Sequence, residues 1–201
     1  MYARAVQQLP EGKDWLYEVK FDGYRCLAGR DSTGVTLWSR RGNRFTDQFP
    51  IVAGACEHLP PDTLLDGELI ALDKDGRVSF NILQHHRSQA QAILFYAFDV
   101  IMHRGRPLIH VPLEIRRELL SDLAGDLKTR TPLIGLSDTL DTTPTELIPL
   151  VNEFGFEGVI AKRKDSCYES GKRTGAWLKY KVNRSQEFVV GGYTTPIRCM
   201  Q

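Results

Sequence analysis

Three things are scarce in this chain: long apolar runs, cysteine and net charge. No apolar stretch among its 201 residues could span a bilayer, and no signal peptide precedes Trp15. The four cysteines lie far apart without metal-like spacing, which favours a reducing cytoplasm: Cys26, Cys56, Cys167 and Cys199. A formal net charge of +1 is not typical of indiscriminate nucleic-acid binding. Any affinity for DNA must therefore come from local basic clusters and should weaken with salt.

The composition fits one folded unit without internal repeats or low-complexity segments. A hydrophobic content of 42% is enough to bury one core. Strand-like segments are expected near residues 15–20, 35–39, 64–72, 94–101, 158–163, 176–182 and 187–193. They alternate irregularly with a few helical stretches, so we predict an α+β fold with mainly antiparallel sheets flanked by helices.

Two helices are predicted from the residues at their boundaries. One begins after Thr143, because Pro144 suits a first helical turn and Glu146 completes a capping box with Thr143. Its apolar face is expected to consist of Leu147, Leu150, Val151 and Phe154. Gly155 should end this helix. The other helix covers about residues 112–124 and carries no evident reactive group.

Lys20 is the strongest candidate for a reactive group. It ends an apolar, strand-like run and is followed by Asp22, Gly23 and Arg25. A lysine amine attacks phosphorus only when unprotonated, and its reference pKa of about 10.4 leaves little free amine at neutral pH. Burial or a nearby cation such as Arg25 would lower that pKa, and Gly23 would let the backbone turn sharply. The pattern predicts a covalent lysine nucleophile, although Asp-Gly after a strand also fits an ordinary hairpin.

Acidic and basic residues recur further along the chain in strand-like settings. Asp66 and Glu68 interrupt an apolar segment, where carboxylates rarely occur unpaired. Glu157 precedes another strand, and Lys179 and Lys181 share one face of the 176–182 strand by its two-residue alternation. This combination predicts a site with acids for a metal ion and cations for phosphate.

Six segments, in order and approximate spacing, resemble the motif series of ATP-dependent DNA ligases, a family of covalent nucleotidyltransferases. They are Lys20-Phe-Asp-Gly-Tyr-Arg25, Ser39-Arg-Arg-Gly42, Leu65-Asp-Gly-Glu68, Phe95-Tyr-Ala-Phe-Asp99, Glu157-Gly-Val-Ile-Ala-Lys162 and Trp177-Leu-Lys-Tyr-Lys181. Segments 15–25 and 186–194 are similar to the ligase domain of bacterial end-joining ligase D. The resemblance covers almost the entire chain and implies the DNA ligase adenylation-domain fold, which is ATP-grasp-like, and a bacterial cytoplasmic protein.

The resemblance implies roles for Lys20 and for two acids. Lys20 would attack the α-phosphate of ATP, release pyrophosphate and carry AMP as a phosphoramidate. Glu68 would hold the ribose or a metal-bound water. Glu157 would help to hold the Mg²⁺ or Mn²⁺ ion that offsets charge on the transferring phosphoryl group, so both acids are expected at the metal site.

The family also implies contacts to the base and the phosphates of the nucleotide. Phe98 would stack on adenine, but Tyr96 shares its side of the strand, so either ring could be the platform. Lys179 and Lys181 would bind the nucleotide phosphates, for which compact ammonium groups are suited. Lys162 belongs to the same site, with no contact assigned to it.

Arginines are the remaining candidates for phosphate contacts. Arg25 would hold a phosphate or ribose oxygen of the nucleotide. Arg40 and Arg41 precede a glycine, where a turn can present guanidinium groups to a DNA phosphate. The family places an arginine near here on the 5′-phosphate at the nick, and Arg40 is favoured over Arg41. Arg173 lies in the basic, glycine-rich segment 171–175. The two residues that follow it, Thr174 and Gly175, match the family pattern only in part.

The resemblance divides the chain into a nucleotidyltransferase (adenylation) domain at 1–186 and the start of a truncated oligonucleotide-binding (OB-fold) domain at 187–201. Only eight residues follow Tyr193, so the second domain is expected to be missing and sealing to be poor. The expected substrate is nicked double-stranded DNA. A monomer is expected, with an end-binding repair protein or a polymerase as its partner.

Three alternatives share part of this pattern. RNA ligases and capping enzymes use the same lysyl chemistry, and a DNA end-binding module without turnover would keep the binding surface alone. NAD-dependent ligases also contain Lys-x-Asp-Gly, but they grip nicotinamide with an upstream domain, and only 19 residues precede Lys20. ATP is therefore the expected nucleotide.

Overall fold

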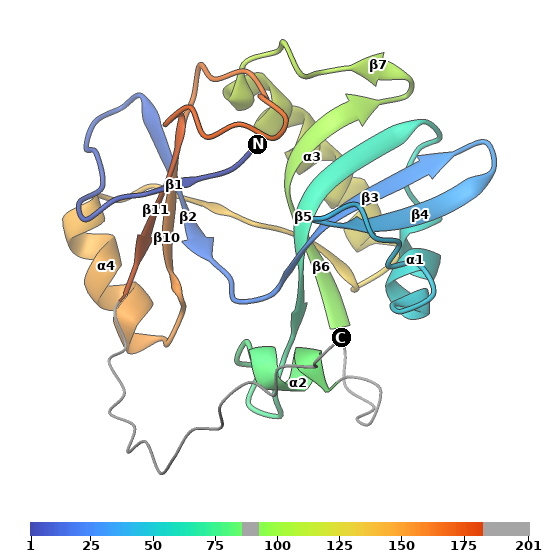
Figure 1. The fold of residues 1–201 in the computed structure, drawn as a ribbon, viewed down its shortest axis with the longest axis horizontal. Helices are drawn as coiled ribbons and strands as arrows, with labels where there is room; N and C mark the ends of the chain where they lie inside the picture. Colours follow the sequence, from blue (N-terminus) through green and yellow to red (C-terminus); the bar gives the residue numbers. More distant parts are fainter. Residues whose placement is uncertain (86–92, 183–201) are drawn as a thin grey trace, which may run out of the picture.

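The computed structural model describes residues 1–85 and 93–182, which form two neighbouring β-sheets (Figure 1). The five-stranded sheet has the order β1 (Arg4–Ala5), β11 (Trp177–Lys181), β10 (Gly158–Arg163), β2 (Trp15–Lys20) and β9 (Thr139–Leu140). The six-stranded sheet has the order β4 (Gly34–Ser39), β3 (Tyr24–Asp31), β5 (Thr63–Ala71), β6 (Ile93–His103) and β7 (Arg106–Pro107), with β8 (Ile134–Leu136) beside β6. Apart from the parallel pairs β1 with β11 and β6 with β8, all paired strands are antiparallel. The predicted α+β fold with mainly antiparallel sheets is confirmed.

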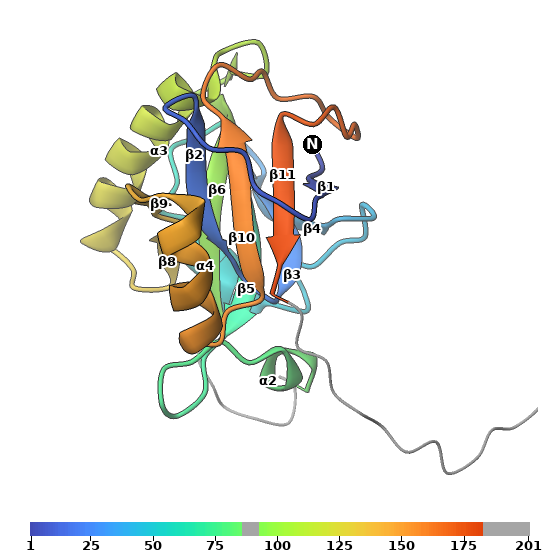
Figure 2. The ribbon, with the colours of Figure 1, turned by 90° about the vertical axis from the view of Figure 1, so that its left-hand side faces the viewer.

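Helices cover each sheet and form separate hydrophobic cores with it. They are α1 (Pro50–Cys56), α2 (Phe80–Gln84), α3 (Leu113–Lys128) and α4 (Pro144–Glu153). The larger core joins the six-stranded sheet to α1 and α3, and the smaller joins the five-stranded sheet to α4. Figure 2 shows α3 and α4 on one side of the molecule, with β11 and β1 toward the other side. None of the helices in the described part of the chain has the length and apolar character that a membrane crossing demands.

Six of the seven predicted strands occur within a few residues of their expected bounds, as β2, β4, β5, β6, β10 and β11. The strand expected at 187–193 and the domain boundary expected after residue 186 lie outside the described residues. The strand β3 was not predicted, because Arg25, Gly29 and Arg30 weaken the strand pattern, although Cys26 and Ala28 are fully buried. Pairing on both sides, with β4 and β5, forms this strand.

The predicted helix boundaries are partly confirmed. Thr143 caps α4 and forms the expected capping box with Glu146, and Gly155 follows the helix with a φ of 77°. The predicted apolar face is wrong for Leu150 and Phe154, which are 47% and 65% exposed. The second helix, α3, continues to Lys128, past the expected end near residue 124.

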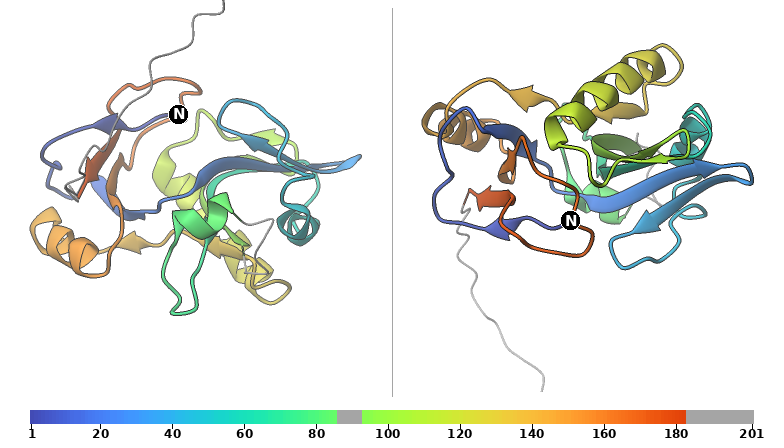
Figure 3. Two further views of the ribbon diagram at one scale, coloured as in Figure 1. Left: turned by 60° about the horizontal axis from the view of Figure 1, so that its bottom comes forward. Right: turned by 90° about the horizontal axis from the view of Figure 1, so that it is seen from above.

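The start of the chain lies between the two sheets, as Figure 3 shows from two directions. Met1, Tyr168 and Trp177 form a third, small buried cluster there. Backbone hydrogen bonds hold this segment in place, from the Val6 N–H to the Lys179 carbonyl in β11 and from the Tyr2 N–H to the Lys172 carbonyl in the loop before β11. The N-terminal residues therefore contribute side chains to the space between the sheets.

Candidate active site

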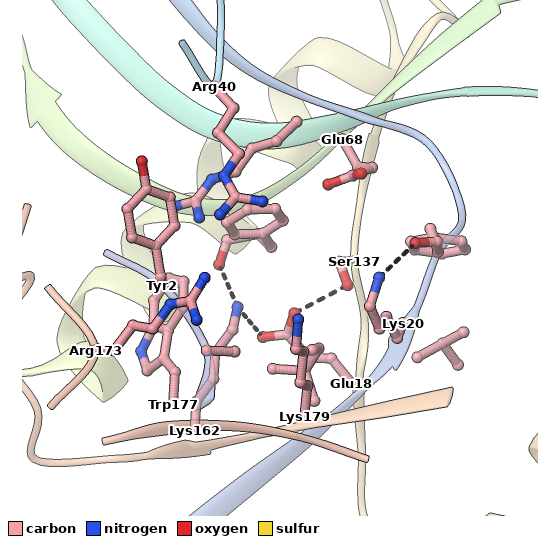
Figure 4. Close-up of a pocket in the computed structure, with 16 residues that line it drawn as sticks. Tyr2, Glu18, Lys20, Arg40, Glu68, Ser137, Lys162, Arg173, Trp177 and Lys179 are labelled. Carbon is pink, nitrogen blue, oxygen red and sulfur yellow. Dashed lines mark hydrogen bonds and ion pairs between the residues drawn. The ribbon is translucent and has the colours of Figure 1, made fainter. Parts of the chain in front are cut away.

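A cavity of about 170 Å³ lies between the two sheets (Figure 4). The five-stranded sheet contributes side chains from β2, β10 and β11, and the six-stranded sheet contributes side chains from β3, β5 and β6. The lining includes eight residues singled out from the sequence: Lys20, Arg25, Arg40, Glu68, Phe98, Lys162, Arg173 and Lys179. It also includes Tyr2, Glu18, Ser137 and Trp177, whose roles the sequence did not indicate.

Strand register brings Lys20, Glu157 and Lys181 together. Gly158, the first residue of β10, is paired with Lys20 on one side and with Lys181 on the other. Glu157, one residue earlier, therefore lies between two lysines, and its carboxylate accepts from Lys20 Nζ at 2.5 Å and lies 2.6 Å from Lys181 Nζ. Burial disfavours the carboxylate, but the hydrogen bonds from Lys181 and Lys20 outweigh it and lower the pKa of Glu157.

Close packing explains why glycine occupies two motif positions. A Cβ atom at Gly158 would lie 2.0 Å from the Tyr180 carbonyl oxygen, so β10 and β11 could not keep their spacing. A Cβ atom at Gly23 would lie 2.2 Å from the Leu69 carbonyl oxygen and 2.9 Å from Glu68 Cγ. Gly23 has no positive φ, so the expected role in a sharp turn is replaced by packing against β5.

Glu68 brings an unpaired carboxylate to the cavity. It is paired in register with Arg25 on β3 and is on the same face of β5 as Asp66. Within residues 1–85 and 93–182, its carboxylate makes no hydrogen bond or ion pair. Burial raises the pKa of Glu68 to about 7, against the nearby charges of Lys20 and Arg25. Such a group can bind a cation or accept hydrogen bonds from a ligand.

Arg25 lines the cavity, but its charge is already compensated. Its Nε and Nη2 atoms donate to the two carboxylate oxygens of Asp66 at 3.0 and 2.5 Å, and the Tyr168 hydroxyl donates to Asp66 at 2.7 Å. Burial opposes ionisation of Arg25, yet Asp66 raises the pKa of the guanidinium above its usual range. The guanidinium is 5.5 Å from the centre of the Phe98 ring, where it can also help to fix that ring.

The structure favours Phe98 over Tyr96 as a flat surface facing the cavity. Phe98 lines the cavity, packs edge-on against Trp177 at 5.9 Å and has the Lys162 ammonium 4.5 Å from its ring centre. Tyr96 is absent from the lining and instead packs 5.1 Å from Phe21. Phe98 is the extra residue at a register shift between β5 and β6, so simple alternation does not place the two rings, and of these two only Phe98 lines the cavity.

A buried charged network lies behind Phe98, and the sequence analysis did not find it. Lys162 is 2% exposed, lies 2.8 Å from the Glu18 carboxylate and donates to the Phe98 carbonyl at 3.3 Å. Arg117 donates to the same carbonyl at 3.2 Å, and the Ser137 hydroxyl donates to Glu18 at 3.0 Å. The signal available was an acid, Glu18, inside the apolar strand that ends at Lys20.

The helix expected near residues 112–124, in which no reactive group was evident from the sequence, contributes an arginine to a second buried ion pair. Arg116 of α3 donates from Nε and Nη2 to the two oxygens of Asp99 at 2.8 Å each, and both side chains are fully buried. Asp99 follows Phe98 directly. The pair therefore holds the end of the Phe98 strand against α3.

The expected phosphate-binding residues do not all reach the cavity. Arg40, Arg173 and Lys179 line it, whereas Arg41 is exposed and outside the lining. Lys181 is 55% exposed and reaches Glu157 at the edge of the site. Burial, followed by the charges of Lys20, Lys181 and Arg173, lowers the pKa of Lys179. Positively charged side chains therefore reach the cavity from both sides, with Arg40 following β4 of the six-stranded sheet and Lys179 on β11 of the five-stranded sheet.

The acids present fit a hard divalent cation such as Mg²⁺. In the part of the chain that the structure describes, no three His, Cys, Asp or Glu side chains form a metal-binding group. Mg²⁺ commonly uses only one or two carboxylates and takes its other ligands from water and substrate phosphates. Glu68 has a free carboxylate, and the charge of Glu157 is near enough to act on its pKa. The pair supplies the oxygen donors that such an ion prefers.

Comparison with known proteins identifies the family of this chain. The family model described as the ATP dependent DNA ligase domain matches residues 2–181. The ligase domain of Mycobacterium tuberculosis LigD has a similar structure, with a TM-score of 0.74 and 34% identity over 83% of this chain and 54% of that chain. The chain therefore belongs to the ATP-dependent DNA ligase domain family.

Individual relatives are also similar over most of this chain. The multifunctional non-homologous end joining protein LigD of Pseudomonas aeruginosa is 39% identical over 197 residues, which cover 96% of this chain and 23% of that protein. A mycobacterial DNA ligase D complexed with ATP and MES has a TM-score of 0.72 and 31% identity, over 89% of this chain and 60% of that chain. The chain spans about a quarter of the length of the curated end-joining relatives LigD of Pseudomonas and Mycobacterium that it matches.

Proposed function

We propose that this domain transfers AMP from ATP to Lys20 and then to the 5′-phosphate of nicked double-stranded DNA, where the 3′-hydroxyl displaces AMP and seals the nick. One observation carries the proposal: Lys20 lines the cavity between the sheets together with Glu68, Phe98 and Lys179, and donates to Glu157 at its edge. Membership of the ATP-dependent DNA ligase domain family supports the same chemistry.

The residues of the site have complementary tasks in the first transfer. Lys20 Nζ forms a bond to the α-phosphorus as the bond to pyrophosphate breaks, and Nζ loses a proton. Phe98 provides the surface for adenine, and Lys179 donates to phosphate oxygens. Glu68 and Glu157 would hold Mg²⁺ or Mn²⁺, which when bound offsets negative charge on the phosphates.

Glu157 is expected to contact two lysines first and a divalent cation afterwards. In the described structure its carboxylate is engaged by Lys20 and Lys181. A divalent cation that Glu157 would hold would take the place of these ammonium groups on the carboxylate and leave both lysines available for contacts to the nucleotide. Lys181, which is more exposed, can then turn toward the nucleotide phosphates.

A sealing assay tests the proposal. The purified chain is incubated with ATP, Mg²⁺ and DNA that carries one nick with a 5′-phosphate, and the joined strand is measured. We expect slow sealing by the wild type and an equal rate for the Lys128→Ala control, since Lys128 is exposed at the end of α3. We expect none from Lys20→Ala. Sealing by Lys20→Ala, or equal sealing of a nicked RNA duplex, would contradict the assignment.

The wider setting is also part of the proposal. The similar LigD proteins are named for non-homologous end joining, which supports a place for this domain in DNA end repair in the bacterial cytoplasm. An end-binding repair protein or a polymerase is the proposed partner, and the chain is proposed to act as a monomer. Residues 1–186 are proposed as the adenylation domain and 187–201 as the start of an OB-fold domain.

A further inference from the structure

The ring of Tyr2 lies among three guanidinium groups at the cavity. The Cζ atoms of Arg40, Arg25 and Arg173 are 4.6, 5.3 and 5.8 Å from its centre. Figure 4 shows Arg40 and Arg173 reaching Tyr2 from opposite sides of the cavity. They come from distant parts of the chain, one directly after β4 and the other from the loop before β11. The tyrosine is therefore the point where the two sides of the site meet.

Two of these three charges have no counter-ion in the structure. Arg25 is neutralised by Asp66 through two hydrogen bonds. Arg40 and Arg173 are exposed, and neither forms an ion pair with a carboxylate within residues 1–85 and 93–182. Two like charges on one ring repel each other, so an arrangement that holds them together is suited to bind an anion between them.

The aromatic ring is what offsets this repulsion. The negative face of a tyrosine ring attracts a guanidinium within about 6 Å of its centre. The main chain that carries the ring is fixed, because the Tyr2 N–H donates to the Lys172 carbonyl at 2.8 Å, next to Arg173. Without the ring, Arg40 and Arg173 would be two long, solvated side chains that an incoming phosphate must order at the cost of rotamer freedom.

We propose that Tyr2 is a positioning residue that gathers Arg40 and Arg173 into one binding site for a phosphate monoester, the 5′-phosphate at the DNA nick. This assignment rests on the proposed function. A phosphate monoester carries a charge of about −1.5 to −2 at neutral pH and three acceptor oxygens, which matches two guanidinium groups. The β- and γ-phosphates of ATP present the same chemistry, so the test must separate these two sources.

Binding is measured for two nicked duplexes that differ only in having a 5′-phosphate or a 5′-hydroxyl at the nick. The ratio of their dissociation constants is the phosphate preference, determined for the wild type, Tyr2→Phe and Tyr2→Leu. Loss of two exposed cation–π contacts predicts that Tyr2→Leu lowers the preference about five- to thirtyfold. Tyr2→Phe keeps the ring and should stay within about twofold of the wild type.

The outcomes separate this proposal from its rivals. An unchanged preference in Tyr2→Leu, with a melting temperature like that of the wild type, overturns it, as does an equal loss in Tyr2→Phe. A raised KM for ATP in AMP loading of Tyr2→Leu, with the 5′-phosphate preference intact, would assign the cluster to ATP instead. Absence of AMP on Lys20 of the wild type would refute the proposed function alone, because the binding ratio requires no AMP transfer.

Discussion

Replacing Glu68 by glutamine should change how the stability of the domain depends on pH. Burial raises the pKa of this carboxyl to about 7, from an ordinary value of 4.5. The folded state therefore holds its proton more tightly than the unfolded state. Stability due to this group is complete below the unfolded pKa and is lost as the pH rises through the folded pKa. The glutamine side chain of Glu68→Gln does not titrate, so this variant should not lose stability in this way as the pH rises.

The size of the effect follows from the two pKa values. Between about pH 5 and pH 8, a shift of this size removes about 2–3 kcal/mol of unfolding free energy from the wild type. The assay is urea denaturation of both proteins at these two pH values without divalent metal. Other titrating groups, His103 among them, are common to both proteins and cancel in the difference. Glu68→Gln should thus gain about 2–3 kcal/mol relative to the wild type on going to the higher pH.

The reasoning would be refuted if the difference in unfolding free energy between the wild type and Glu68→Gln changed by less than about 0.5 kcal/mol over this pH range. Glu68 would then be solvated, with an ordinary pKa, and the description of the cavity as a site with a free, poorly hydrated carboxylate would fail. Addition of Mg²⁺ provides an internal check. A cation at Glu68 favours the carboxylate form, so Mg²⁺ should stabilise the wild type more at the higher pH.

Three further predictions address the site and its support. Glu157→Gln should slow AMP loading about a hundredfold, as expected from losing a few kcal/mol of metal-assisted charge stabilisation. Lys181→Ala changes a half-exposed lysine and should slow loading less than Glu157→Gln does. The rates are measured in a quenched radiolabel assay, and equal rates for the two variants would contradict this prediction. Gly158→Ala should destabilise the domain by about 2 kcal/mol or more in urea denaturation, because it forces β10 and β11 apart. Gly125→Ala, at an open position of α3, should leave the stability unchanged or raise it. A larger loss of stability in Gly125→Ala than in Gly158→Ala would be inconsistent with the packing. Phe98→Ala should weaken ATP binding by about 1–3 kcal/mol, measured by calorimetry. Phe98→Tyr keeps the ring and should bind ATP about as tightly as the wild type. Equal ATP affinities for Phe98→Ala and the wild type would exclude stacking on this ring.

The sequence could predict those parts of the fold that depend on local patterns. Alternating apolar residues marked six strands, and Thr143 and Glu146 marked the start of α4 correctly. It failed where tertiary contacts decide the outcome. Leu150 and Phe154 continue the helical spacing of an apolar face, but the five-stranded sheet covers only part of that face. A period of 3.6 residues gives the direction of a face and leaves the width of the buried part undetermined.

The candidate site shows the same division. Motif order was enough to select Lys20, Glu68, Phe98 and Lys179, all of which line the cavity. Tyr2 had no motif, because its importance arises from three arginines that are far from it in sequence. Strand register decided other details: only the pairing of β10 with both β2 and β11 puts Glu157 between two lysines. Long-range pairing of this kind has no local signal.

The most direct test of the central claim is intact-protein and peptide mass spectrometry after incubation with ATP and Mg²⁺. The claim is that the amine of Lys20 becomes bonded to AMP. We expect a mass increase equal to one adenylyl group, located on the peptide that contains Lys20, acid-labile as a phosphoramidate and absent from Lys20→Arg. No such increase after prolonged incubation, or the same increase in Lys20→Arg, would contradict the claim.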